Sequence, residues 1–418
     1  MYNMSFISGG IMKKYKVDSL SKYLALIEEN IISDFIYRGQ SEPYFSIQAS
    51  GFRPYCGGWD SDMIYDMPYL HTSFYNRVIG QLSEDERKYF LAFCQHHGIP
   101  TNLVDVSYSP LVALFFACDG KSERKFTLSE FIGDMSIDDF EKDASCQNTF
   151  IHNLINQVKK PFYSQYAQIY MLKKERLINV TDLIVELNGR NLFDVLLTDE
   201  ILTLKLLKAI KEHFKSIKCA TLNVWLKNIL EEYVKINELN SFLSLSDELH
   251  LVIKSALKSD DIDYKDIFRA LEKDHKFGLF QKVLVHEPLT FQIDSDIIAT
   301  LYTIILIEIL DTLKNAPQKV NIDLDIYFTY QPPQLFERIS NQQSFFIYQP
   351  YLYTNDGVYN YCELNIQSIN ADVIIEIDNH SNILKELQLL GIDKGTIYGD
   401  IDNIAKSVLN SSGKLFKV

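Results

Sequence analysis

One stretch, residues 95–117, constrains the fold of this chain more than any other, and it reads QHHGIPTNLVDVSYSPLVALFFA. Its second half is almost entirely apolar and has to be buried, whereas polar side chains crowd its first half. Ser109 followed by Pro110 favours a helix start, because Ser caps free N–H groups and Pro fits the first helical turn. The stretch therefore predicts a buried helix that begins beside a group of polar side chains.

The composition of the chain limits the classes of protein to which it can belong. A chain of 418 residues that is 47% hydrophobic can bury two or three cores. The net charge of -14 argues against a protein that coats nucleic acid. The six cysteines form no CxxC pair, which fits neither a zinc site nor a disulfide framework and favours a reducing compartment. No signal-length or membrane-length apolar run occurs. We therefore expect a cytoplasmic protein, with neither nucleic acid nor membrane as a partner.

A second motif lies at residues 34–40, which read DFIYRGQ. Aromatic and β-branched residues favour a strand here, and residues 18–29 predict a short amphipathic helix before it. Arg38 would lie at the end of this strand, where Gly39 lets another group approach closely. The segment alone leaves two roles open for Arg38, a ligand contact and a structural ion pair.

Residues 68–98 have a helical pattern, with Ser83 opening a capping box and Gly98 as a stop. This places His96 and His97 in the last turn. Adjacent residues on a helix do not share a face, so at most one of them can point into a site. Their spacing does not suit a metal ion, and we expect no metal site. His97 is either a catalytic residue or a neutral buried histidine bonded to the main chain.

The middle of the chain has a different pattern. Residues 121–160 are polar and acidic, and residues 168–174 (QIYMLKK) alternate in a way that predicts a strand. Apolar residues then recur at helical spacing, with charged residues between them, at 201–217, 222–236, 264–276 and 297–313. Glu308 interrupts the last of these runs, which therefore predicts a buried helix rather than a membrane span.

The motifs YRGQ at 37–40 and QHHGIPTNLVDVSYSPLVALFFA at 95–117 together resemble the FRG domain. That family is named for an aromatic-Arg-Gly motif and carries a block of the QHxGxPTxLxDxxxSPLxALxFA type. Many positions agree in order and spacing, which makes the resemblance more specific than a single short motif. ERISNQQSFFIYQPY at 337–351 and ILKELQLLGIDKGTIYGDIDNIAKSV at 383–408 also resemble family elements. Ser344 stands where the family usually has Gly.

This resemblance implies an α+β fold with a discontinuous core. A small mixed or antiparallel sheet with helices would form from residues 1–120 and 320–418, with a further core strand near 166–174. Residues 121–319 would form a mainly helical insertion, which could contact a protein partner.

The layout of the family is similar to that of ADP-ribosyltransferase-fold proteins. The resemblance thus implies a nucleotide or other small-molecule partner and NAD as a candidate substrate, with any cofactor left open. Cleavage of the nicotinamide glycosidic bond, in a toxin or phage-defence setting, would be the activity. The catalytic residues would be Arg38, His97, Asp105 and Gln343. The binding residues would be Arg38, Gln40, Thr101, Ser107, Ser109, Arg338 and Gln342.

Other interpretations stay open. Asp105, Thr101, Gln342 and Gln343 could each serve only a cap, a turn or a buried main-chain group. A hydrolase triad of Ser109, His97 and Asp105 is disfavoured, because a helix-cap serine lacks the GxSxG elbow that would expose it. A nuclease-type toxin and a non-catalytic nucleotide-binding sensor are the two alternative functions.

Overall fold

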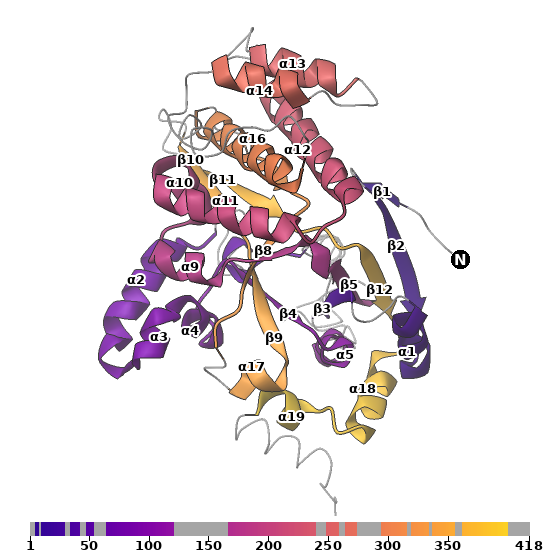
Figure 1. The fold of residues 1–418 in the computed structure, drawn as a ribbon. Helices are drawn as coiled ribbons and strands as arrows, with labels where there is room; N and C mark the ends of the chain where they lie inside the picture. The colour runs from indigo at the N-terminus through magenta and orange to yellow at the C-terminus, as the bar shows by residue number, and fades with distance from the viewer. Residues whose placement is uncertain are drawn as a thin grey trace, which may run out of the picture.

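The computed structural model describes most of the chain, with a central sheet and a group of helices at one end (Figure 1). The described residues are 5–7, 10–29, 34–41, 47–53, 64–120, 166–239, 248–258, 264–273, 294–315, 319–333, 337–355 and 362–399. The polar segment 121–160 and the end of the predicted terminal helix, 400–408, lie outside these residues.

Over the described residues, the central sheet is mixed and has nine strands in the order β1-β2-β12-β5-β3-β4-β9-β8-β6. In that order the strands are Ser5–Ile7, Gly10–Val17, Val373–Ile377, Ala167–Lys173, Phe35–Gln40, Leu103–Ser107, Ser344–Tyr348, Tyr327–Tyr330 and Leu177–Asn179. The pairs β12–β2 and β6–β8 are parallel, and the other pairs are antiparallel. The predicted α+β class is confirmed, and the sheet is wider than the small sheet expected from the sequence.

One half of the sheet is covered on one face by α1 (Leu20–Glu29), α5 (Pro110–Asp119) and α18 (His380–Leu389), whose apolar residues share a core with strands β2, β12, β5 and β3. α5 begins as predicted, because the Ser109 side chain accepts a hydrogen bond from the Val112 N–H and Pro110 occupies the first turn. Its apolar residues are almost all buried, so α5 is the helix that fixes this half of the sheet.

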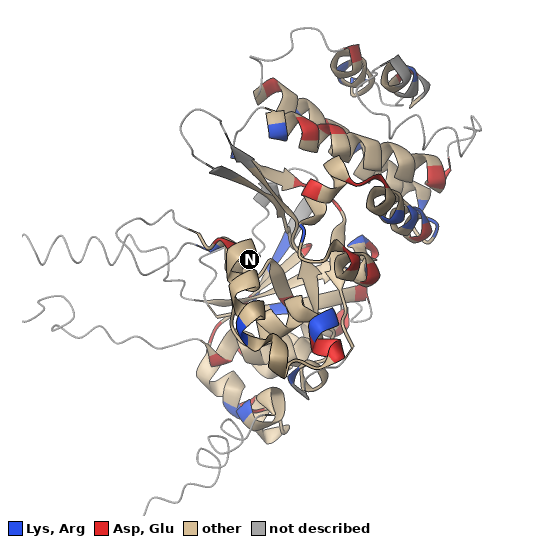
Figure 2. Cartoon of the chain, turned by 90° about the vertical axis from the view of Figure 1, so that its left-hand side faces the viewer, with Lys and Arg blue, Asp and Glu red and all other residues tan. Residues whose placement is uncertain are grey.

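Further helices cover the other half, from β4 to β6, and extend away from it. They are α4 Phe90–His96, α9 Thr181–Leu187, α10 Leu192–Thr198, α11 Glu200–Phe214, α12 Cys219–Leu239, α13 Glu248–Ala256, α14 Tyr264–Lys273 and α16 Ser295–Asn315. The four helices predicted from apolar spacing are confirmed as α11, α12, α14 and α16, and α16 lies in the core. None of the helices in the described part of the chain has the length and apolar character needed to cross a bilayer. Both basic and acidic residues are scattered over the outer helices (Figure 2).

The opposite face of the central sheet packs against a second sheet, of which the structure describes three strands in the order β10-β11-β7. These strands are Tyr351–Asn355, Cys362–Ser368 and Asn321–Asp323. Gln349 links the two sheets, since its Nε2 donates to the Gln367 main-chain oxygen at 2.7 Å and its Oε1 accepts from the Ala49 N–H at 2.9 Å. The loop at residues 47–53 is thereby held against the core that the two sheets share.

A partly buried charged cluster joins the helices to the sheet. Arg176 Nη1 lies 3.4 Å from Asp372 Oδ1, and its Nε donates to the main-chain oxygen of Asp325 at 2.7 Å. Asn228, on α12, donates to Asp325 Oδ2 at 2.9 Å. Burial raises the pKa of Asp325 and, with the neighbouring Asp325 carboxylate, raises the pKa of Asp323 to about 6. This cluster thus carries more carboxylates than one guanidinium can balance.

The remaining helices lie at the margins of the molecule. α2 (Met67–Val78) and α3 (Glu84–Lys88) precede α4, and the predicted capping box of Ser83 and Glu86 is present at the start of α3. α17 (Glu337–Asn341) precedes β9, and α19 (Lys394–Tyr398) follows α18.

Candidate ligand-binding site on the Arg38 face

Strand β3 divides the aromatic-Arg-Gly motif between the two faces of the sheet. Tyr37 is fully buried in the core beneath α1 and α5, and Ile36 belongs to the core on the opposite face. Because side chains alternate along a strand, Arg38 and Gln40 project on the Ile36 face. Gly39 lies on the α5 side, where a Cβ atom would overlap the main-chain oxygen of Ala113. Within the motif, Tyr37 therefore packs in the core, Gly39 leaves room for α5, and Arg38 projects its guanidinium on the opposite face of the sheet.

Arg38 bridges two strands that diverge. β3 and β4 are paired at one position, Tyr37 opposite Ser107. Beyond that position, Arg38 Nη1 donates to the main-chain oxygen of Asp105 at 2.7 Å, and Arg38 Nε faces Gln40 Oε1 at 3.5 Å. The side chain thus takes the place of ladder hydrogen bonds, which fixes a half-buried cation near the middle of the sheet.

Four polar residues form a row across β3, β5, β12 and β2 on the Arg38 face. Strand register pairs each with the next, and we call them the polar row: Gln40, Gln168, Glu376 and Lys16. The adjacent row, which contains Arg38, consists of Arg38, Tyr170, Ile374 and Lys14. Sheet faces that pack on another layer are usually apolar, so two amides and a carboxylate in register are a candidate binding surface.

Hydrogen bonds connect these two rows. Tyr170 Oη donates to Gln168 Oε1 at 2.8 Å, and Lys14 Nζ lies 2.7 Å from Glu376 Oε1. Burial raises the pKa of Tyr170 to about 12, against the opposing effect of the Arg38 charge. Tyr170 therefore stays a neutral hydroxyl at physiological pH and can donate a hydrogen bond.

On the other face, Asp105 is connected to the histidine-containing motif through Gln95. The Asp105 side chain lies on the same face as Ser107, two residues on, and its Oδ2 accepts from Gln95 Nε2 at 2.8 Å. Gln95 Oε1 in turn accepts from the buried Thr101 hydroxyl at 2.5 Å. Thr101 and Asp105 are among the site residues predicted from the sequence, whereas Gln95 is not. Gln95 opens the motif, and its side-chain amide can both donate and accept hydrogen bonds.

Ser107 and Ser109 lie at the far end of β4. Ser107 Oγ donates to the main-chain oxygen of Gln342 at 2.7 Å and accepts from the Ser109 N–H at 3.0 Å. Ser109 Oγ caps α5. Both hydroxyls thus have main-chain partners that position the start of α5 against the segment before β9.

Gln342 and Gln343 form the turn between α17 and β9. Gln342 is buried, and its Nε2 donates to the main-chain oxygen of Ile397 at 3.3 Å. Gln343 is exposed and has a positive φ of 45°, while its main-chain oxygen accepts from the Tyr108 N–H at 3.2 Å. Ser344, where the family usually has Gly, is already the first residue of β9. The left-handed residue of this turn is therefore Gln343.

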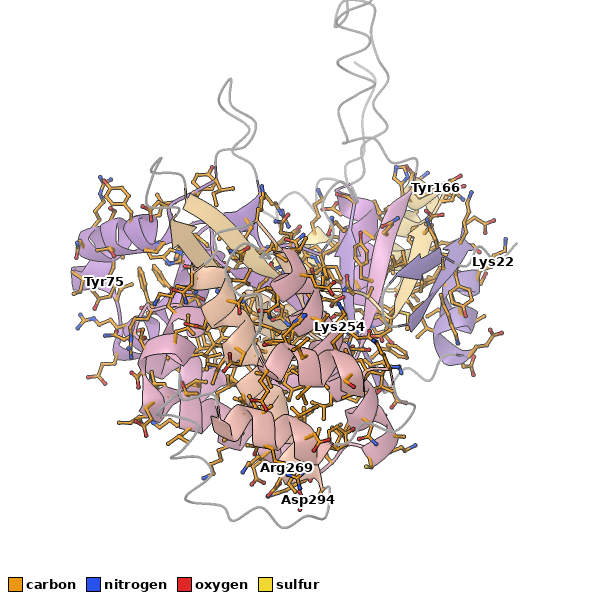
Figure 3. All side chains as sticks on the ribbon, turned by 90° about the horizontal axis from the view of Figure 1, so that it is seen from above. Lys22, Tyr75, Tyr166, Lys254, Arg269 and Asp294 are labelled. Atoms are coloured by element: carbon orange, nitrogen blue, oxygen red, sulfur yellow. The ribbon has the colours of Figure 1, made fainter. Side chains whose placement is uncertain are left out.

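Arg338 and His97 lie on two other parts of the surface. The Arg338 guanidinium carbon is 5.0 Å from the ring centroid of Tyr398, on α19. His97 follows α4, and its ring centroid lies 4.3 Å from that of Phe93, within an aromatic group next to α2. Figure 3 shows Tyr75, on α2, at the opposite side of the molecule from Tyr166, which precedes β5.

The structure thus distributes the predicted site residues among several places. Arg38 and Gln40 share a face, Asp105 and Thr101 meet through Gln95, and the remaining residues form separate groups. Their catalytic and binding roles stay predictions. Within the described ranges, no group of three or more His, Cys, Asp or Glu side chains is arranged to hold a metal ion.

The fold places the chain among α+β proteins built on an open mixed sheet. Residues 33–125 match the family model of the FRG domain, and the chain is therefore an FRG domain-containing protein. The matched segment runs from just before β3 to just beyond α5, and so includes Arg38, Gln95 and Asp105. No curated protein and no solved structure matches the chain.

Proposed function

We propose that this FRG domain-containing protein binds NAD on the Arg38 face and cleaves its nicotinamide–ribose bond, as an ADP-ribosyltransferase-like effector. The observation that supports this most is the half-buried guanidinium of Arg38, which is held by the Asp105 main chain beside the amides of the polar row. A planar guanidinium can grip a phosphate through two parallel hydrogen bonds.

The neighbours of Arg38 suit the rest of a nucleotide. The amides of Gln40 and Gln168 can each donate and accept, as sugar hydroxyls and a carboxamide require. Tyr170 is buried beside them, and its neutral hydroxyl donates to Gln168 Oε1 and so orients that amide. In the reaction, the C–N bond to nicotinamide breaks, its electron pair leaves with the nicotinamide nitrogen, and water or an acceptor nucleophile attacks the oxocarbenium-like carbon.

Nicotinamide release measures the activity directly. Purified protein is incubated with NAD, alone and with cell lysate, and nicotinamide is quantified by chromatography. We expect release by the wild type and its loss in Arg38→Lys, because a single ammonium replaces a fork of donors. Absence of release under both conditions would refute the enzymatic part of the proposal. Thermal denaturation of the variant separates loss of the site from loss of the fold.

A non-catalytic nucleotide sensor is the second candidate. The observation that favours it is that the Ser107 and Ser109 hydroxyls and the Gln342 amide all bond to the main chain. Residues used in this way support the scaffold rather than a reaction. Saturable binding of ADP-ribose without turnover, lost in Arg38→Lys, would support the sensor and exclude the enzyme.

The setting in a toxin or phage-defence response is part of the proposal. Induced expression of the wild type in a bacterial host is expected to slow growth or to restrict phage, with cellular NAD falling in parallel. The Arg38→Lys variant serves as the matched control. Growth arrest that is unchanged in this variant would argue for an activity elsewhere in the chain.

A further inference from the structure

The polar row contains a carboxylate that the motifs do not reveal. Along β12, Ile375 and Ile377 are buried beneath the helices, so Glu376 projects on the Arg38 face. Its register partners are Gln168 on β5 and Lys16 on β2. The Glu376 side chain is 18% exposed, which places it between the buried core and open solvent.

The contacts of Glu376 define its orientation. Lys14 Nζ lies 2.7 Å from Oε1, diagonally across the two strands. Lys16, its direct register partner, instead donates to Tyr166 Oη at 2.7 Å and lies 3.3 Å from Asp378 Oδ2. The ion pair with Lys14 therefore engages Oε1 and holds the carboxylate on the Arg38 face.

The separation from Arg38 fits a nucleotide laid across the strands. Neighbouring strands lie about 4.8 Å apart, so the two steps from β3 to β12 cover roughly 10 Å, and the offset of two residues along the strand brings the separation of the Arg38 and Glu376 backbones to roughly 12 Å. In NAD a ribose lies between the diphosphate and the nicotinamide bond. With the phosphate on Arg38 and the sugar over β5, the anomeric carbon would come within reach of Glu376.

We infer that Glu376 is the catalytic carboxylate of this site, an inference that rests on the proposed cleavage of NAD. As the bond to nicotinamide breaks, positive charge develops on the ribose, and the Glu376 carboxylate stabilises it. Water then attacks the anomeric carbon and gives up a proton, which passes through the carboxylate to solvent. The products are nicotinamide, ADP-ribose and one proton, and no oxidant or reductant is needed.

The test compares turnover with binding in Glu376→Gln, which keeps the size and removes the charge. We expect nicotinamide release to fall about 100-fold or more, as for loss of a group that acts on the transition state. The dissociation constant for ADP-ribose, from isothermal titration calorimetry, is expected to stay within about threefold. Asp378→Asn is the matched control, because it removes a lysine-paired carboxylate from the end of the same strand.

Each outcome separates this inference from the function on which it rests. Wild-type release with equal release by Glu376→Gln would overturn the role of Glu376 and leave the function intact. Loss of ADP-ribose binding together with turnover would make Glu376 a binding residue instead. A wild-type protein that neither binds nor cleaves NAD would refute both the proposed function and the role of Glu376. If Glu376→Gln does not fold, Glu376→Asp keeps the charge and withdraws it by one methylene, and turnover reduced at unchanged binding is expected.

Discussion

The Arg38 guanidinium lies 2.7 Å from the main-chain oxygen of Asp105, a residue 67 positions later in the chain. The two motifs that carry the FRG resemblance are therefore one physical unit, in which the first supplies a side chain and the second the carbonyl that holds it. Gln95 extends this unit, because its amide connects the Asp105 carboxylate to Thr101.

Gly39→Ala tests whether the motif glycine is required for packing. A methyl group at Gly39 would overlap the Ala113 carbonyl and approach the Ala117 nitrogen to 2.7 Å, and both are main-chain atoms of a buried helix. We expect the free energy of unfolding, from urea titration, to fall by at least about 2 kcal/mol. Gly80→Ala is the control, since nothing lies within 4 Å of a Cβ there. Equal stability of the two variants would contradict the close packing of α5.

Thr101→Val tests the connection through Gln95. The substitution keeps the shape of the side chain but removes the donor to Gln95 and the acceptor for the buried Leu103 N–H at 3.1 Å. A buried donor left without a partner costs about 1–3 kcal/mol, and we expect a loss of that size in urea unfolding. Thr72→Val removes an exposed hydroxyl contact to the Pro68 oxygen and is expected to change stability by less than about 0.5 kcal/mol. Similar losses of stability in the two variants would contradict a specific stabilising contribution from the Thr101 hydroxyl and its connection to Gln95.

Arg176→Met tests the charged cluster that joins the helices to the sheet. The Arg176 side chain is 12% exposed, and its removal leaves the partly buried carboxylates of Asp325 and Asp372 without their cation. Breaking such a pair costs about 3–5 kcal/mol. Arg190→Met removes a pair with Asp199 from a side chain that is 50% exposed, and should cost about 1 kcal/mol or less. The free energy of unfolding of both variants is measured by chemical denaturation at neutral pH. A loss in Arg176→Met that is no larger than the loss in Arg190→Met would contradict the role of Arg176 in the cluster.

Asp323→Asn tests the pH dependence of the same cluster. Burial, with the charge of Asp325, raises the pKa of Asp323 to about 6, above the value of about 3.9 in an unfolded chain. A raised carboxyl pKa means that the fold favours the protonated form, so this contribution to stability is complete below pH 4 and declines as the pH rises to 6.

The variant lacks that ionisation. We expect it to be more stable than wild type at pH 7.5, by on the order of 1–3 kcal/mol, and nearly equal to it at pH 4. Asp266→Asn, which alters an exposed pair with Arg269, is the control for removal of a surface carboxylate, and its stability at pH 7.5 is expected to stay close to that of wild type. A constant difference between Asp323→Asn and wild type from pH 4 to 7.5 would show that the pKa of Asp323 is not raised.

Local structure could be predicted from the sequence because local chemistry determines it. The cap at Ser109 and the strand near 168–174, which coincides with β5 at Ala167–Lys173, both depend on neighbouring residues. The long amphipathic helices were predictable for the same reason, since their apolar spacing is repeated over several turns.

The site was harder to predict, because it depends on strand register. Glu376 and Gln168 become neighbours through pairing between strands about 200 residues apart, and no motif marks either of them. His97 was assigned from its place in a motif, whereas the end of α4 directs its ring toward Phe93. Gln95 could have been found, since it opens the motif and lies 10 residues from Asp105.

The position of β12 has a consequence for synthesis. β12 lies between β2 and β5, so one half of the sheet stays divided until residues 373–377 have left the ribosome. Contacts between segments this distant form slowly. A nascent chain would present Arg38 long before Glu376 could join it, so a ribosome-bound or prematurely terminated product would lack the assembled surface. Assembly of the site would then wait for the emergence of β12 from the ribosome.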